Sequence, residues 1–174
     1  GLDTWGVDFG LLDANGTLLG NPYHYRDSRT DGVMEQVFAR VPREQVFDQT
    51  GIQFMQLNSL FQLYAMRLAD APALRVASTF LPMPDLFNFW LTGRRANEFS
   101  IATTTQCYDP RKKTWATDLL TRLDLPVAPF GGGKASIVAP GTRLGHLRAD
   151  IAAELDIVPM DVIAPACHDT GSAV

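Results

Sequence analysis

Apolar side chains recur every three to four positions along several stretches of the chain, the pattern of amphipathic helices. The stretch 58–69 shows it most clearly, and Asn58 or Ser59 can cap its start. Pro42 suits the first turn of another helix, and Gly51 suits its end. Helices are therefore expected over residues 31–41, 42–51, 58–69, 85–93, 115–123 and 148–155.

Two other stretches favour strands. Residues 4–13 mix aromatic, β-branched and apolar side chains, and the Asn15-Gly16 pair that follows is a strong hairpin signal. The chain is therefore expected to open with a hairpin. Gly6 and Gly10 mark positions where bulk is excluded, by a close approach of backbone or ligand or by a plain bulge. The apolar run over 158–166 predicts a closing strand.

Composition narrows the class of protein. The 174 residues are 46% apolar and 20% charged, which is ordinary for a soluble globular protein of one or two domains. A net charge of −4 argues against a nucleic-acid partner, because proteins that bind nucleic acids are rich in Lys and Arg on the binding surface. No apolar run approaches the roughly 18 residues of a membrane span, so no membrane partner is expected and the cytoplasm is the expected location.

Residues that bind metals or phosphates form no strong motif. Cys107 and Cys167 lie far apart and the three histidines are scattered, so neither a disulfide framework nor a metal site is predicted. The run Gly131-Gly132-Gly133-Lys134 is not a phosphate loop, because such a loop needs Ser or Thr after the Lys, where Ala135 stands. A turn is expected there instead.

The last fourteen residues carry the most suggestive chemistry. The apolar run 162–167 ends abruptly in His168-Asp169-Thr170, and small residues follow. This pattern predicts a buried strand that surfaces at its carboxyl end and leads into a helix N-terminus, where ligands bind in open α/β sheets. Asp169 would there accept a proton from a substrate hydroxyl. The alternative is that Asp169 or Thr170 only caps the helix.

Two polar segments are weaker candidates. The charged run 26–29 is either a solvated loop before a helix cap or a rim whose charges pair internally. Glu98 and the run Thr103-Thr104-Thr105 are placed either to line a sugar-sized polar pocket or to form a surface turn or strand edge.

Several local patterns agree with one family. The matching pieces are DTWGVDFGLLD (3–13), YRDSRTDG (25–32), GIQFMQLNSLFQL (51–63), LPMPDLFNFWLTG (81–93), NEFSIATTTQ (97–106) and CHDTGSAV (167–174). In these pieces, which cover nearly the whole chain in family order, the sequence resembles the FGGY family of carbohydrate kinases. The first and last pieces resemble most the branch of the family that acts on L-rhamnulose.

The resemblance implies a fold and a domain organisation. The fold class is α/β, a ribonuclease H-like (actin-like ATPase) domain with a mixed sheet and flanking helices. Residues 1–174 would be part of the N-terminal sugar-binding domain. The first phosphate-binding hairpin and the C-terminal ATP-binding domain are expected outside this chain, as are most contacts to ATP and Mg²⁺. The 174 residues alone are therefore not expected to turn over ATP.

The resemblance also implies an activity. It is transfer of the γ-phosphate of ATP to the 1-hydroxyl of L-rhamnulose, giving L-rhamnulose 1-phosphate, with Asp169 as the catalytic base. The positions that contact the sugar in the family correspond here to Gly6, His168, Asp169 and Thr170. Trp5 is expected to form part of the wall of the sugar pocket. The alternatives are a kinase for another ketose such as L-fuculose or D-xylulose, a non-catalytic sugar-binding domain of the same fold, and a hydrolase that uses Asp169 and His168 on a water.

Overall fold

The structure is a computed structural model that describes residues 1–131 and 135–174. The turn expected at 131–134 therefore falls almost entirely outside the described residues. The strands are β1 (Phe9–Leu12), β2 (Thr79–Pro82), β3 (Ala96–Glu98), β4 (Tyr108–Asp109), β5 (Thr114–Trp115), β6 (Ser136–Val138), β7 (Thr142–His146) and β8 (Asp161–Ala164). The helices are α1 (Val33–Arg40), α2 (Arg43–Thr50), α3 (Ser59–Leu68), α4 (Pro72–Val76), α5 (Met83–Thr92), α6 (Phe99–Thr103), α7 (Thr117–Arg122), α8 (Ala149–Glu154) and α9 (Asp169–Ser172), with 3₁₀ turns at Ser28–Thr30 and Ala128–Phe130.

The opening hairpin is only partly as predicted. The turn forms, since the Asp13 amide donates to Thr17 O at 3.0 Å, but the return pairs through a single bridge between Leu12 and Leu18. The main partner of β1 is β2, which runs antiparallel to it and is buried throughout. Sequence reasoning missed β2, a buried run of four residues that ends at Pro82 and leads directly into α5.

The remaining strands also pair two by two within the described residues. β3 and β6 are parallel, whereas β4–β5 and β7–β8 are antiparallel, so the mixed character expected of the sheet structure is confirmed. The closing strand β8 is shorter than predicted. Val158 and Met160 lie before it and are 84% and 58% exposed, which is why the apolar run there does not mark strand.

Most helix predictions are confirmed, with shifted ends. Gly51 and Gly93 end α2 and α5 with positive φ of 67° and 76°, a conformation that only glycine adopts without strain. Asn58 occupies the N-cap of α3, but its side chain donates to Gln53 O and Gln106 Oε1 instead of capping. Trp115 belongs to β5, so α7 begins two residues later than expected.

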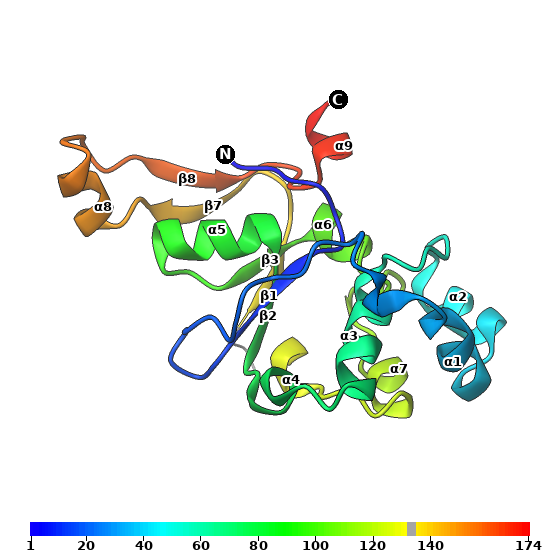
Figure 1. The fold of residues 1–174 in the computed structure, drawn as a ribbon. Coiled ribbons are helices and arrows are strands. Elements are labelled where there is room, and N and C mark those ends of the chain that lie inside the picture. Colours follow the sequence, from blue (N-terminus) through cyan, green and yellow to red (C-terminus); the bar gives the residue numbers. More distant parts are fainter. Residues whose placement is uncertain (132–134) are drawn as a thin grey trace.

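The buried apolar residues form a large cluster around β1, β2, α1, α3 and α7, a smaller one between α5, β7, β8 and α8, and a third of Leu12, Leu81 and Leu86. Figure 1 shows α1, α3 and α7 on one side of the molecule and α8, β7 and β8 on the other, with β1 and β2 between them. The first residues of the chain run between these two sides and pass beside α9, so segments from the two ends of the chain meet there.

Candidate functional site

Two segments more than 160 positions apart in the chain lie side by side at the candidate site. Thr4 and His168 form a parallel bridge, in which the Thr4 amide donates to Cys167 O at 3.1 Å and the Asp169 amide donates to Thr4 O at 2.8 Å. The strand-to-helix transition predicted at the end of β8 is therefore present, and it is fixed against the start of the chain.

His168, not Asp169 or Thr170, occupies the N-cap of α9. Its Nδ1 accepts from the Thr170 amide at 3.3 Å and also lies 3.3 Å from Asp169 Oδ1. Asp169 Oδ1 accepts from the same amide at 2.6 Å and from Thr170 Oγ1 at 3.3 Å. Within the described part of the chain, no hydrogen bond or ion pair involves Asp169 Oδ2, and the side chain is 54% exposed. One oxygen of the carboxylate thus stays available to a ligand.

Gly6 sits where a side chain could not. A Cβ built there would lie 2.9 Å from His168 Cδ2 and 3.0 Å from Thr104 Oγ1, so bulk is excluded here as predicted, by two side chains and not by backbone. The Asp8 amide donates to Gly6 O at 2.9 Å across Val7, whose φ is +70°. This is a γ-turn of the rare strained type, costly for a β-branched residue. The Val7 carbonyl accepts from Ser59 Oγ at 2.5 Å, which helps to hold the turn.

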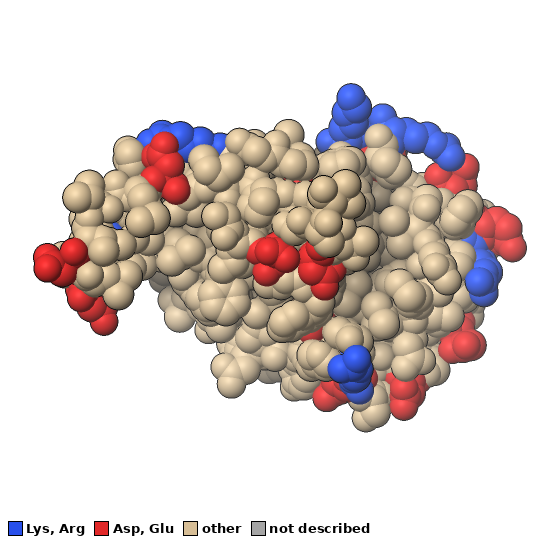
Figure 2. Space-filling model, turned by 90° about the horizontal axis from the view of Figure 1, so that it is seen from above, with Lys and Arg blue, Asp and Glu red and all other residues tan. Residues whose placement is uncertain are grey.

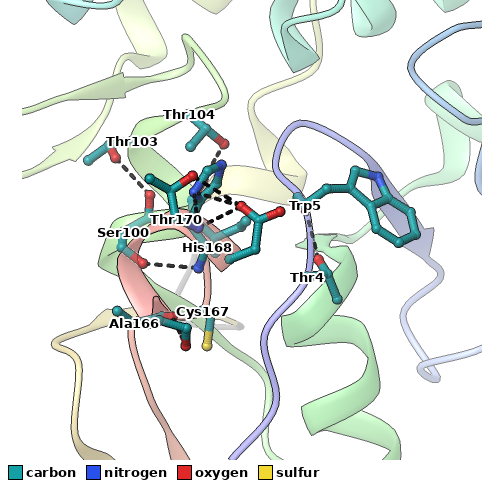
Figure 3. A network of polar contacts seen from close by, with 12 residues as sticks. Thr4, Trp5, Ser100, Thr103, Thr104, Ala166, Cys167, His168 and Thr170 are labelled. Carbon is teal, nitrogen blue, oxygen red and sulfur yellow. Dashed lines mark hydrogen bonds and ion pairs between the residues drawn. The ribbon is translucent and has the colours of Figure 1, made fainter. Parts of the chain in front are cut away.

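A pocket of about 390 Å³ opens beside these segments, a volume that suits a small ligand. Four of the five predicted contact residues line it: Trp5, Gly6, His168 and Asp169. Thr170 lies next to the lining, on the first turn of α9. Figure 3 shows His168 and Thr170 on one side of the Thr4–Trp5 segment and the indole of Trp5 on the other. Seen from the side of α9, the centre of the surface is mostly uncharged with a small acidic spot (Figure 2).

The indole of Trp5 is held in place although it is 43% exposed. Its Nε1 donates to Asp8 Oδ2 at 2.7 Å, and Asp8 is only 2% exposed. The other oxygen of Asp8 accepts from Gln62 Nε2 at 3.2 Å. The buried Asp8 carboxylate, which is itself held by Gln62 on α3, therefore fixes the orientation of the Trp5 indole.

Sequence reasoning did not single out the rest of the wall. Tyr25, Ile52, Gln53, Met55 and Leu57 also line the pocket, in the loops before α1 and between α2 and α3. They lack the periodicity of helices and strands. The only signal for them was that they fall within the family-like pieces 25–32 and 51–63.

The weaker polar candidates have mixed outcomes. Thr104 lines the pocket, but Glu98 does not, because it is fully buried and caps the start of α6. In the segment 26–29 the expected pairing of charges is not seen among the described residues, and the alternative of a loop before a cap holds. Asp27 Oδ1 caps the 3₁₀ turn by accepting from the Arg29 backbone amide at 2.9 Å, and Arg29 Nη2 donates to the neutral Gln62 Oε1 at 2.6 Å. Burial lowers the pKa of Arg29, although nearby acidic groups oppose the shift.

Cys167 is not a nucleophile despite its place beside His168. It is fully buried, and desolvation, followed by the nearby Asp85 and Glu98 carboxyls, raises the pKa of its thiol. No three His, Cys, Asp or Glu side chains among residues 1–131 and 135–174 are grouped so that they could hold a metal ion. No helix in those ranges is long and apolar enough to cross a membrane.

The fold is similar to the folds of solved sugar kinases. Over 94% of this chain and 32% of the other, it superposes on gluconate kinase from Lactobacillus acidophilus with a TM-score of 0.82 at 16% identity. Over 95% of this chain and 33% of the other, it superposes on glycerol kinase with ADP from Plasmodium falciparum with a TM-score of 0.79 at 14% identity. At such identities the likeness concerns the fold alone.

The chain belongs to the FGGY family of carbohydrate kinases, whose N-terminal domain model matches residues 1–174. It is 43% identical to a rhamnulokinase of Oceanobacillus iheyensis, over all of this chain and 36% of the relative. It is 42% identical to the rhamnulokinase of Bacteroides thetaiotaomicron, over all of this chain and 35% of the relative. The chain thus spans about a third of the length of these curated relatives.

Proposed function

We propose that the protein carrying this chain is an ATP-dependent kinase that phosphorylates the 1-hydroxyl of L-rhamnulose, giving L-rhamnulose 1-phosphate in rhamnose catabolism. The observation that carries the proposal is the Asp169 carboxylate, in a chain whose curated relatives are rhamnulokinases. Asp169 lines a sugar-sized pocket, and its Oδ2 has no hydrogen bond or ion pair among the described residues. The cytoplasm is the expected setting for such a metabolic enzyme.

Asp169 acts as the general base in this proposal. Its carboxylate takes the proton of the C1 hydroxyl while that oxygen forms a bond to the γ-phosphorus of ATP. The bond between the γ-phosphorus and the bridging oxygen breaks at the same time, and ADP leaves with the bonding electrons. A carboxylate that is half exposed and only partly hydrogen-bonded is well placed to accept this proton.

The remaining predicted contact residues hold the sugar. His168 Nε2 lies close to Gly6 and can form a hydrogen bond with a sugar oxygen. The absence of a side chain at Gly6 lets backbone approach the ligand. Trp5 supplies an aromatic wall, against which the C–H faces of a sugar pack, and Thr170 offers a hydroxyl at the start of α9.

ATP and Mg²⁺ are assigned largely to parts of the protein other than these 174 residues. The residues described here bring together no group suited to hold a metal ion, so no step of the reaction is routed through Mg²⁺ on this chain. The relatives are nearly three times as long, and the rest of their length is where we place the nucleotide site.

The wall of the pocket favours a 6-deoxyketose. Ile52, Met55 and Leu57 form an apolar surface, and Val7 and Trp5 extend it. L-Rhamnulose and L-fuculose both present a methyl group that such a surface accommodates, whereas D-xylulose ends in a hydroxyl that would lose its water without gaining a partner. The identity to rhamnulokinases favours L-rhamnulose between the first two.

The test is an ADP-release assay on the full-length protein with ATP, Mg²⁺ and a panel of L-rhamnulose, L-fuculose, D-xylulose and glycerol. We expect kcat/KM to be highest for L-rhamnulose and lowest for glycerol. Sugar binding by calorimetry without any phosphorylation would instead support a non-catalytic sugar-binding domain. Turnover of a substrate in the absence of ATP would support a hydrolase that uses Asp169 and His168.

A further inference from the structure

Glu98 is a buried carboxylate that no step of the proposed reaction uses. It is 0% exposed and lies at the junction of β3 and α6. Its oxygens accept from the Ser100 amide at 2.8 Å, the Ser100 hydroxyl at 2.5 Å and the Ile101 amide at 3.2 Å. A fourth donor comes from far along the chain, because the Cys167 amide donates to Glu98 Oε2 at 2.9 Å.

Such a group is costly to bury, so its position calls for a reason. An ionised carboxylate loses its hydration on burial and needs several hydrogen bonds in return. None of the ion pairs formed within residues 1–131 and 135–174 involves Glu98, so its compensation there comes from neutral donors. A helix cap alone would need neither a glutamate nor a contact to Cys167, since Ser, Thr, Asp and Asn are the usual capping residues.

Ser100 extends the same contact by one residue. Its hydroxyl gives its proton to Glu98 Oε2, so the lone pairs of the oxygen are free to accept from the His168 amide at 3.3 Å. Figure 3 shows this bond joining α6 to the segment that carries His168. The backbone amides of Cys167 and His168 thus donate to Glu98 and Ser100, two residues that are hydrogen-bonded to each other.

The opposite side of the same segment is held by Thr4. Its amide donates to Cys167 O, and its carbonyl accepts from the Asp169 amide. The three amides from Cys167 to Asp169 are therefore all satisfied by groups that lie elsewhere in the chain. The backbone between them has little freedom to turn, and the side chains of His168 and Asp169 project from it into the pocket.

From this arrangement we infer that Glu98 and Ser100 are positioning residues for phosphoryl transfer, which hold the Cys167–His168 backbone so that Asp169 and His168 face the sugar. The inference rests on the proposed kinase function. Small displacements of a reacting group are expensive in rate, about a hundredfold for 1 Å. Loosening this backbone should therefore reduce kcat without disturbing ATP binding.

The test compares Ser100→Ala with Thr103→Ala in the full-length kinase. Thr103 lies on the same short helix and is also half-buried, and its hydroxyl donates to Ser100 O at 2.8 Å, but it makes no hydrogen bond to residues 167–169. Both variants lose one hydroxyl from α6. We expect Ser100→Ala to lower kcat about tenfold while KM for ATP stays the same, and Thr103→Ala to keep the kcat of the unaltered enzyme.

Glu98→Gln is the second variant. Its amide nitrogen cannot accept a hydrogen bond, so at least one of the four donors is left without a partner, and the same selective loss of kcat is expected. Equal kcat values for Ser100→Ala, Thr103→Ala and the unaltered enzyme would overturn the inference. A Ser100→Ala variant whose KM for ATP rises by the same factor as its kcat falls would also overturn the inference. Failure of the unaltered enzyme to phosphorylate any sugar would instead reject the proposed function, which separates the two claims.

Discussion

Different interactions hold together two regions of the molecule: the helical region around α1, α3 and α7, and the region where Thr4 meets His168. The first packs apolar stripes from neighbouring helices into one cluster. The second joins the two ends of the chain through backbone bonds, a strained turn at Val7 and buried carboxylates at Asp8 and Glu98. Stability comes chiefly from the first region, whereas the geometry on which the proposed chemistry depends comes from the second.

The largest change in stability is expected from the helical region. Leu119 on α7 is fully buried, so Leu119→Ala leaves a cavity and should lower the free energy of unfolding by about 2–5 kcal/mol. Because Leu119 contributes nothing to the pocket lining, kcat/KM measured well below the unfolding temperature should stay unchanged. Thermal unfolding and steady-state assays on the same preparation check both parts. A large fall in kcat/KM of the folded variant would contradict the separation.

The reverse pattern is expected at Gly6. In Gly6→Ala the new methyl group would press on the His168 ring and the Thr104 hydroxyl, both about 3 Å away. We expect kcat/KM for the sugar to fall about a hundredfold, because the ring must move out of place. Gly10→Ala is the matched control, since its methyl group meets only the side chains of Leu86 and Leu18. If the two variants lose the same kcat/KM, the close approach at Gly6 has no special role.

A smaller effect is expected at the aromatic wall. Trp5→Phe keeps an aromatic face but removes the hydrogen bond from the indole to Asp8. The wall should lose its fixed orientation, which should raise KM for the sugar a few-fold, in line with about 1 kcal/mol for such a bond, with kcat little changed. Steady-state kinetics over a range of sugar concentrations would measure this. A change confined to kcat would place Trp5 in the chemistry rather than in binding.

The smallest effect concerns pH. Burial raises the pKa of Asp85 well above its ordinary value of 3.8, opposed by hydrogen bonds from the Glu98 amide. A carboxyl whose pKa is raised by folding favours the folded state in its protonated form, so its contribution to stability falls as pH rises above about 4. Asp85→Asn should therefore flatten the dependence of Tm on pH above the ordinary pKa of 3.8. An unchanged slope would mean that Asp85 titrates normally.

The parts of the molecule that sequence patterns predict are those set by local physics. The apolar stripe of α3 and the glycines that end α2 and α5 act within a few residues. The apolar run that ends at His168 likewise reveals the strand-to-helix transition, because a change from apolar to polar residues is a local signal.

The parts that were not predicted depend on residues far apart in the chain. The alternatives for Glu98, pocket lining or a surface turn or strand edge, did not include full burial, because that burial depends on the Cys167 amide, a partner 69 positions away. The positive φ of Val7 is supported by Ser59, 52 positions away. β2 is identified only through its pairing with β1, which no local pattern reveals. Tertiary contacts decide each of these features.

The most direct test of the account is Asp169→Asn in the full-length kinase, with kcat from ADP release and the sugar Kd from calorimetry. The amide keeps the shape of the side chain but cannot accept the proton of the C1 hydroxyl. We predict that kcat falls by a factor of about 10² to 10⁴ while the Kd for L-rhamnulose changes only a few-fold. A variant that phosphorylates L-rhamnulose at the rate of the unaltered enzyme would contradict the central claim that Asp169 is the base.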